Sequence, residues 1–217
     1  MRKRLTGFWW IPLFVFSVVL NLFLLLRGQF IPSGVRVIGV IDGDTFVLEG
    51  KSKVRLRYVD APELAFCGGL AAKSYLEKLV VGKNVRIEEQ IPDQYGRGMA
   101  LVYQGNTLVN REMLESGWAR YHSDISSVTD EMKKAAGEAK NNSRGIYGAC
   151  QSKDIPDNPN CVIKGNIDTN SDARTYYLPT CAQYKFTIVE KDIGEGWFCT
   201  EKEALAAGFT KAATCKQ

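Results

Sequence analysis

The sequence predicts an α+β chain with three parts: one transmembrane helix, a five-stranded β-barrel with three helices, and a small disulfide-bonded α+β domain. Three observations lead to this fold class. An uncharged run of 19 residues follows a basic N-terminus, period-two apolar patterns then alternate with helical ones, and four of the six cysteines lie beyond residue 160. With 45% hydrophobic and 24% charged residues, the composition excludes wholesale disorder.

The N-terminal segment, residues 1–33, accounts for the net charge of +4, because it has no acid and four basic residues: Arg2, Lys3, Arg4 and Arg27. As a helix, the run from Phe8 to Leu26 would span about 28 Å, close to the thickness of a bilayer core. We therefore predict a transmembrane anchor over about 8–26, with a cytoplasmic N-terminus and an extracytoplasmic remainder. A cleavable signal peptide, which would leave a secreted protein, is the alternative.

Residues 34–150 have the pattern of a small closed barrel. Period-two alternation predicts five strands, at 36–41, 45–50, 53–59, 84–89 and 96–103. Helical spacing predicts three helices, over 70–81, 108–115 and 127–140. Ser127 and Asp130 resemble a capping box at the start of the third helix. Five strands interrupted and followed by helices suit a barrel rather than an open sheet.

The chain after residue 150 predicts a linker and a second, smaller domain. Residues 151–160 contain two prolines and two asparagines without apolar periodicity, which is typical of a linker. Residues 161–217 combine short strands with a helix that Thr200 and Glu203 would cap. Residues 34–150 hold 16 basic and 15 acidic residues, so bulk charge gives no reason to expect nucleic acid as a partner.

The chemistry is concentrated between residues 42 and 63. Asp42 and Asp44 flank a tight turn between two strands, and Asp60 and Glu63 follow the next strand. Strand ends of a barrel can bring these carboxylates together, where they would repel one another unless a cation were present. All the ligands would be oxygens, so a hard cation is expected, Ca²⁺ or Mg²⁺.

Two arginines are expected beside this acidic cluster. Arg55 precedes Asp60 on the same strand, and Arg97 begins another strand. A substrate phosphate between metal and guanidinium groups would explain both. The single histidine, His122, excludes a multi-histidine metal centre, and we interpret it as a structural residue or a residue at the substrate rim.

Three ordered segments, VIDGDTF at 40–46, RLRYVDAPE at 55–63 and DQYGRGMALVY at 93–103, resemble the motifs of thermonuclease, the staphylococcal nuclease family. The resemblance extends over about residues 35–149. It implies an OB-fold barrel and a nuclease that uses one Ca²⁺, cuts single-stranded or locally melted DNA and RNA, and leaves 3′-phosphates.

The resemblance also implies a role for each matched residue. Asp44, Asp60 and the backbone carbonyl of Ala61 would bind Ca²⁺, and Asp42 would support these ligands without binding the ion itself. Glu63 would orient or deprotonate the attacking water. The reacting phosphate would be bound by Arg55 and Arg97, and the nucleotide by Tyr95.

Two positions differ from the family pattern. Gln94 stands where the family has a lysine, which removes one phosphate contact. The second base-stacking tyrosine of the family has no clear counterpart, since Tyr121 and His122 are only nearby. These differences affect nucleotide affinity and base preference rather than catalysis.

Six cysteines outside the cytosol predict three disulfides. Cys67 follows the acidic segment and Cys150 ends the barrel domain, so this pair would join the two. The segments YYLPTC at 176–181 and WFCTEKEALAAGFTKAATC at 197–215 resemble a small zinc module of bacterial DNA-alkylation repair proteins. The segments CVIKGNI at 161–167 and GEGWFCTEKEA at 194–204 resemble the "sunset" accessory domain of surface nucleases. The first resemblance places Cys181 and Cys215 at ligand positions, which implies that they bridge and leaves Cys161 for Cys199. A zinc ion bound by four cysteines is the alternative.

Together these features predict a membrane-anchored, extracytoplasmic Ca²⁺-dependent nuclease. The alternative is a non-catalytic OB-fold protein of the cell envelope that binds nucleic acid. No protein partner is expected.

Overall fold

The computed structural model describes residues 10–27, 34–93 and 96–215, and it has two compact units, residues 1–34 and 35–217. The first unit contains helix α1 (Trp10–Arg27). No helix in the described part of the chain is long and apolar enough to cross a membrane. The transmembrane helix expected at 8–26 is therefore wrong, and so is the single-pass localisation that depended on it; residues 8 and 9 lie outside the described residues.

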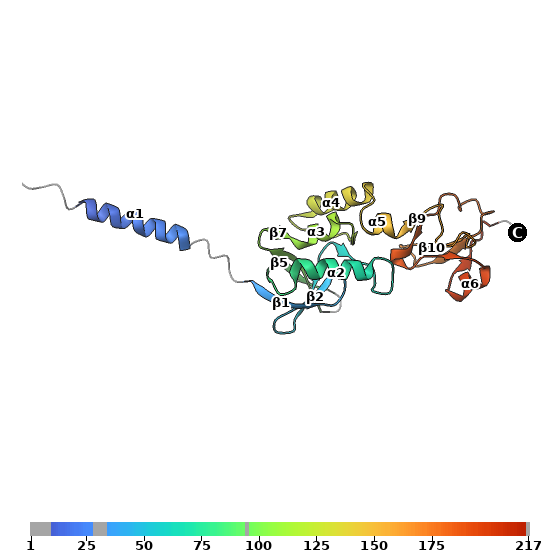
Figure 1. Cartoon of the computed structure of the whole chain (residues 1–217), viewed down its shortest axis with the longest axis horizontal. Helices are drawn as coiled ribbons and strands as arrows, with labels where there is room; N and C mark the ends of the chain where they lie inside the picture. The colour runs from blue at the N-terminus through green and yellow to red at the C-terminus, as the bar shows by residue number, and fades with distance from the viewer. Residues whose placement is uncertain (1–9, 28–33, 94–95, 216–217) are drawn as a thin grey trace, which may run out of the picture. The chain divides into compact units, whose positions relative to one another are not determined.

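The second unit contains a closed five-stranded barrel (Figure 1). Its strands are β1 (Val35–Val40), β2 (Thr45–Leu48), β3 (Lys53–Leu56), β5 (Asn84–Pro92) and β6 (Gly98–Gln104). They pair in the order β3-β2-β1-β5-β6, and the parallel pairing of β3 with β6 closes the barrel. The short strand β7 (Thr107–Leu108) folds back and pairs antiparallel with the end of β6. The mixed α+β architecture that the sequence predicts is thus confirmed.

Alternate strand residues fill the barrel, and helices cover it. Among the fully buried residues are Val37, Phe46, Val85 and Val102. Helix α2 (Gly69–Val80) lies across the barrel in Figure 1, while α3 (Val109–Glu115) and α4 (Thr129–Asn141) lie side by side. The four-residue helix α5 (Ile146–Ala149) ends this region. A separate two-stranded ladder joins β4 (Val59–Asp60) to β8 (Arg120–Tyr121).

Helix α4 begins one residue later than a capping box at Ser127 would place it. Its N-cap is Val128, which forms no side-chain capping hydrogen bond. The hydroxyl of Ser127 instead donates to Glu89 of β5 at 2.5 Å. The expected cap is therefore wrong, because the Ser127 side chain bonds to β5 rather than to the start of α4.

The C-terminal region has its own four-stranded sheet, in the order β13-β10-β11-β14. The elements are β9 (Gln151–Ser152), β10 (Ile163–Ile167), β11 (Arg174–Tyr177), β12 (Val189–Glu190), the 3₁₀ helix η1 (Lys191–Ile193), β13 (Trp197–Phe198), α6 (Glu201–Ala206) and β14 (Thr210–Lys211). The predicted cap of α6 is confirmed, since Thr200 Oγ1 accepts a hydrogen bond from the Glu203 amide at 3.2 Å.

Three disulfides link the cysteines. They join Cys67 to Cys150, Cys161 to Cys199 and Cys181 to Cys215. The expectation of disulfide bonds is supported, and no cysteine within the described residues is free. Cys67–Cys150 ties the segment that follows β4 to the end of α5.

Candidate functional site

The turn from Asp42 to Asp44 joins β1 to β2 and packs tightly against its surroundings. The Asp44 amide donates to Asp42 Oδ1 at 3.1 Å. A Cβ atom added at Gly43 would lie 2.5 Å from the Cβ of Ala61 and 2.6 Å from that of Ala72 in α2. Only glycine allows this approach, and it brings Asp44 beside Ala61, whose amide donates to Asp44 Oδ2 at 3.3 Å.

Arg55 connects the two carboxylates expected to bind a metal. Its Nη1 lies 2.8 Å from Asp44 Oδ1, and its Nη2 lies 3.0 Å from Asp60 Oδ1. The β2–β3 ladder places Arg55 opposite Thr45, the neighbour of Asp44, while Asp60 ends β4. The structure therefore brings together three residues from separate segments that the sequence analysis grouped.

A further cation would stabilise the charged form of the buried Asp44 carboxylate. Asp44 is only 3% exposed, and this burial raises the pKa of its carboxyl to about 7. The charge of Arg55 opposes the rise, and the charge of Asp42 adds to it. Thus a single guanidinium does not offset the cost of burying this carboxylate.

The donor set fits a hard cation. Asp44, Asp60 and the main-chain carbonyl of Ala61 supply oxygen only, which suits Ca²⁺, and Ca²⁺ also accepts water ligands. Across the described residues, no group of three or more His, Cys, Asp or Glu side chains is placed to bind a metal. The protein would therefore contribute two carboxylates and one carbonyl at this position rather than a complete cage.

Glu63 lies in an exposed loop that begins directly after Asp60. At the start of α2, a Cβ on Gly69 would collide with the carbonyl oxygen of Glu63, so the loop turns closely over the helix end. Asp60, Ala61 and Glu63 line one cleft. Glu63 thus lies at the same cleft as Asp60 and Ala61, two of the three candidate ligands.

Arg97 borders a second, adjoining cleft together with Arg55, Asp60 and His122. Its Nε lies 2.6 Å from Asp93 Oδ2, and this hydrogen bond raises the pKa of Arg97. Arg55 and Arg97 therefore face one cleft, as a phosphate between them would require. Gln94 and Tyr95, expected to contact the nucleotide, lie outside the described residues.

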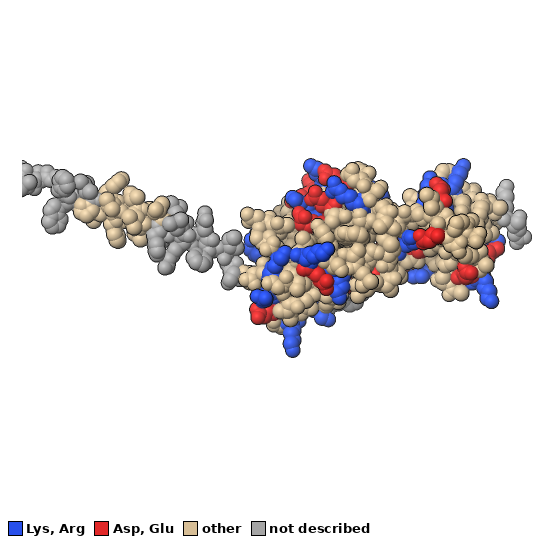
Figure 2. Space-filling model, in the orientation of Figure 1, with Lys and Arg blue, Asp and Glu red and all other residues tan. Residues whose placement is uncertain are grey.

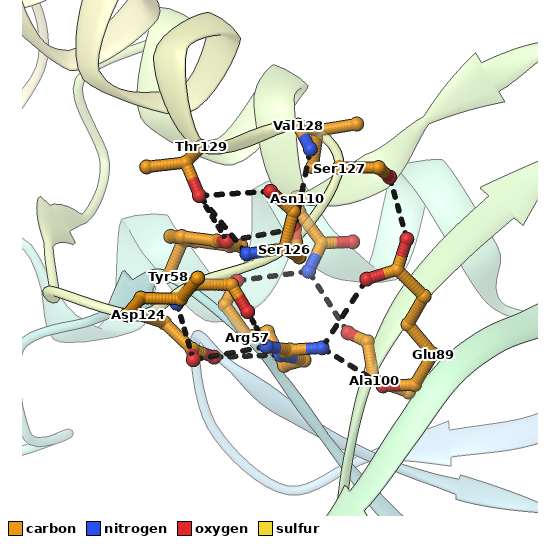
Figure 3. A network of polar contacts seen from close by, with 11 residues as sticks. Arg57, Tyr58, Glu89, Ala100, Asn110, Asp124, Ser126, Ser127, Val128 and Thr129 are labelled. Atoms are coloured by element: carbon orange, nitrogen blue, oxygen red, sulfur yellow. Dashed lines mark hydrogen bonds and ion pairs between the residues drawn. The ribbon is translucent and has the colours of Figure 1, made fainter.

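A buried polar network fixes the wall of this second cleft (Figure 3). Arg57 is 4% exposed, and its Nε and Nη2 donate to the two oxygens of Asp124 at 2.6 and 2.9 Å. The hydroxyl of Tyr58 lies 2.7 Å from that of Ser126. Asp124 also lines the cleft beside His122, so the network holds the loop that carries both.

This network was not predicted from the sequence. Its only local signal was the alternation of Arg57 with Arg55 in the strand that leads to Asp60. Nothing near Asp124 indicated that its partner lay 67 residues away.

Comparison with known proteins finds similarity to nucleases. Residues 53–148 match the family described as "Staphylococcal nuclease homologue". The chain is 33% identical over 118 residues to an "Uncharacterized endonuclease" of Escherichia coli O157:H7, which covers 52% of this chain and 75% of the relative. It is 40% identical over 88 residues to an "Uncharacterized endonuclease" of Haemophilus influenzae, which covers 39% of this chain and 49% of the relative.

A plant protein, "Probable staphylococcal-like nuclease CAN3" of Oryza sativa subsp. japonica, is 32% identical over 117 residues, 54% of this chain. The match covers 30% of that relative's length, so most of the plant protein has no counterpart here. The family match ends at residue 148, and the resemblances stated for residues 161–217 stay predictions.

Proposed function

This chain belongs to the staphylococcal nuclease homologue family, and we propose that it is a Ca²⁺-dependent nuclease that cuts DNA and RNA and leaves 3′-phosphates. The observation that carries the proposal is the position of Arg55 between the carboxylates of Asp44 and Asp60. A guanidinium among acids suits a site that binds a phosphate beside a hard cation.

The site residues have separate roles in phosphodiester hydrolysis. Asp44, Asp60 and the Ala61 carbonyl would hold the Ca²⁺, which when bound stabilises charge on the phosphate oxygens. Arg55 and Arg97 face the same cleft, where their guanidinium groups bind the phosphate and stabilise the charge that develops as water attacks.

In this proposal Glu63 activates the water, and its support is that Glu63 lines a cleft with Asp60 and is open to solvent. Its carboxylate accepts a proton as the water oxygen bonds to phosphorus. The bond from phosphorus to the 5′ oxygen breaks, the 5′ oxygen takes a proton from solvent, and the phosphate stays on the 3′ oxygen.

Bulk charge does not account for substrate binding. On the face seen in Figure 2, basic and acidic side chains are intermingled over residues 35–217. Residues 34–150 carry nearly equal numbers of each, so non-specific attraction to a nucleic acid backbone is weak. The weak attraction favours a catalytic site made of a few specific residues over the alternative, a non-catalytic OB-fold protein that binds nucleic acid.

The test is cleavage of single-stranded DNA and RNA oligonucleotides by the full chain with Ca²⁺ or with EGTA. We expect Ca²⁺-dependent cleavage, and mass spectrometry of the products should find 3′-phosphates. Binding of the oligonucleotides without cleavage in Ca²⁺ would favour the non-catalytic alternative and overturn the proposal.

The role of Glu63 has its own test. Glu63→Gln should lower turnover by about 10²–10⁴-fold, because it removes the proton acceptor, while Ca²⁺ binding measured by calorimetry persists. Glu49→Gln, at an exposed position after β2, is the matched control and should cleave normally. Normal cleavage by Glu63→Gln would remove Glu63 from the mechanism.

A further inference from the structure

The C-terminal region contacts the loop that carries Glu63. Strand β9 follows Cys150 directly and pairs with β12, and the Lys191 amide donates to the Cys150 carbonyl at 2.9 Å. Cys150 is bonded to Cys67, at the end of that loop. A Cβ at Gly194 would lie 2.9 Å from the ring of Phe66, so backbone and ring are packed directly together.

A partly buried ion pair also connects the C-terminal region to strand β8. Arg120 Nε donates to Asp192 Oδ2 at 2.6 Å, and Arg120 Nη2 lies 3.3 Å from Glu190 Oε1. The Asp192 side chain is fully buried, and its Oδ1 has no hydrogen-bond partner among the residues that the structure describes. A buried carboxylate with one unpaired oxygen depends strongly on its cation, so Arg120 and Asp192 should be tightly coupled.

Arg120 is also the register partner of Asp60. Both belong to the two-stranded ladder β4–β8, in which Val59 pairs with Tyr121 and Asp60 with Arg120. One cleft is lined by Asp60, Glu63, Arg120 and Asp192, so η1 contributes to its wall together with the loop. The ion pair thus holds the strand that fixes the backbone of a candidate metal ligand.

We propose that Asp192 is a positioning residue for the nuclease site: through Arg120 it fixes the β4–β8 ladder and, with it, the segment from Asp60 to Glu63. This inference rests on the proposed function. Asp192 touches neither substrate nor metal in this role. Its effect is geometric, because a displacement of about 1 Å in a catalytic group can cost about 10²-fold in rate.

The experiment compares the full chain with Asp192→Asn and Asp157→Asn. Asp157 forms an exposed ion pair with Lys191, also in η1, so this control removes the same charge from the same region. Two quantities are measured: hydrogen exchange of peptides covering residues 60–68, and kcat and KM on single-stranded DNA with Ca²⁺.

Asp192→Asn should speed exchange in residues 60–68 and lower kcat by about 10-fold, with KM within about 2-fold of the wild type. Asp157→Asn should change neither. Arg120→Lys keeps the charge but loses the forked geometry, so it should fall between these two and serves if Asp192→Asn does not fold.

A folded Asp192→Asn with wild-type exchange and kcat would overturn the inference, as would exchange that rises equally throughout residues 35–217. If the wild type does not cleave but exchange at 60–68 still responds to Asp192→Asn, the nuclease proposal fails while the coupling stands.

Discussion

Arg55 Nη1 lies 2.8 Å from Oδ1 of Asp44, a carboxylate whose side chain is only 4% exposed. The same guanidinium reaches Asp60 at 3.0 Å, so one arginine offsets the repulsion between two acids. In the proposed reaction it must also bind phosphate. Its planar, forked geometry therefore matters as well as its charge.

We expect Arg55→Lys to lower kcat by about 10²-fold, because a point charge cannot reproduce the paired contacts. Cleavage of single-stranded DNA at saturating Ca²⁺ measures this. Arg36→Lys, at an exposed position of β1, should leave kcat unchanged. If Arg55→Lys retained wild-type kcat, Arg55 would have no role beyond pairing the acids.

Gly43 should be irreplaceable for packing. The Cβ of Gly43→Ala would lie within 2.6 Å of the Cβ atoms of Ala61 and Ala72, far inside carbon–carbon contact distance. We expect a loss of about 1–3 kcal/mol in the free energy of unfolding, measured with urea. Gly137→Ala, on the open face of α4, should instead add about 0.5–1 kcal/mol. Equal stabilities of the two variants would contradict the close packing at Gly43.

The parts of the site that are close in the chain were predictable, and the contacts between distant segments were not. Alternation and the Asp-Gly spacing identified Asp44, Arg55 and Asp60, and barrel closure brings them together. Arg120 and Asp192 are 72 residues apart, and neither lies in a motif that predicts its partner. The local pattern at Ser127 even predicted a cap that a contact with Glu89 replaces.

Asp124 should stabilise the fold mainly above pH 4. The hydrogen bond from Arg57 lowers the pKa of Asp124 below its usual value, so its contribution is present above that value and is lost as the pH falls through the folded-state pKa. We expect Asp124→Asn to cost about 2–3 kcal/mol at pH 7 and less at pH 3, measured by urea unfolding. A cost independent of pH would mean that the Asp124 charge is not what the network uses.

Glu195 should give the opposite pH dependence in a different range. Its carboxylate is 5% exposed and accepts hydrogen bonds from the amides of Ile167 and Glu190. Burial raises its pKa to about 7, the two amide hydrogen bonds oppose the rise, the charge of Glu190 adds to it, and Arg120 lowers it.

A raised pKa in the folded state means that the folded protein binds more protons than the unfolded chain between about pH 4.5 and 7. The stability linked to Glu195 is thus fully present below pH 4.5 and is lost as the pH rises through 7. We expect the wild type to lose about 1–3 kcal/mol from this group between pH 5 and 8.

Glu195→Gln imitates the protonated side chain and should reduce the loss of stability between pH 5 and 8. Glu203→Gln, which changes a carboxylate of α6 in the same region, should leave that loss unchanged. Urea midpoints at pH 5 and pH 8 compare the three proteins. If Glu195→Gln kept the full wild-type slope, the titrating group would lie elsewhere.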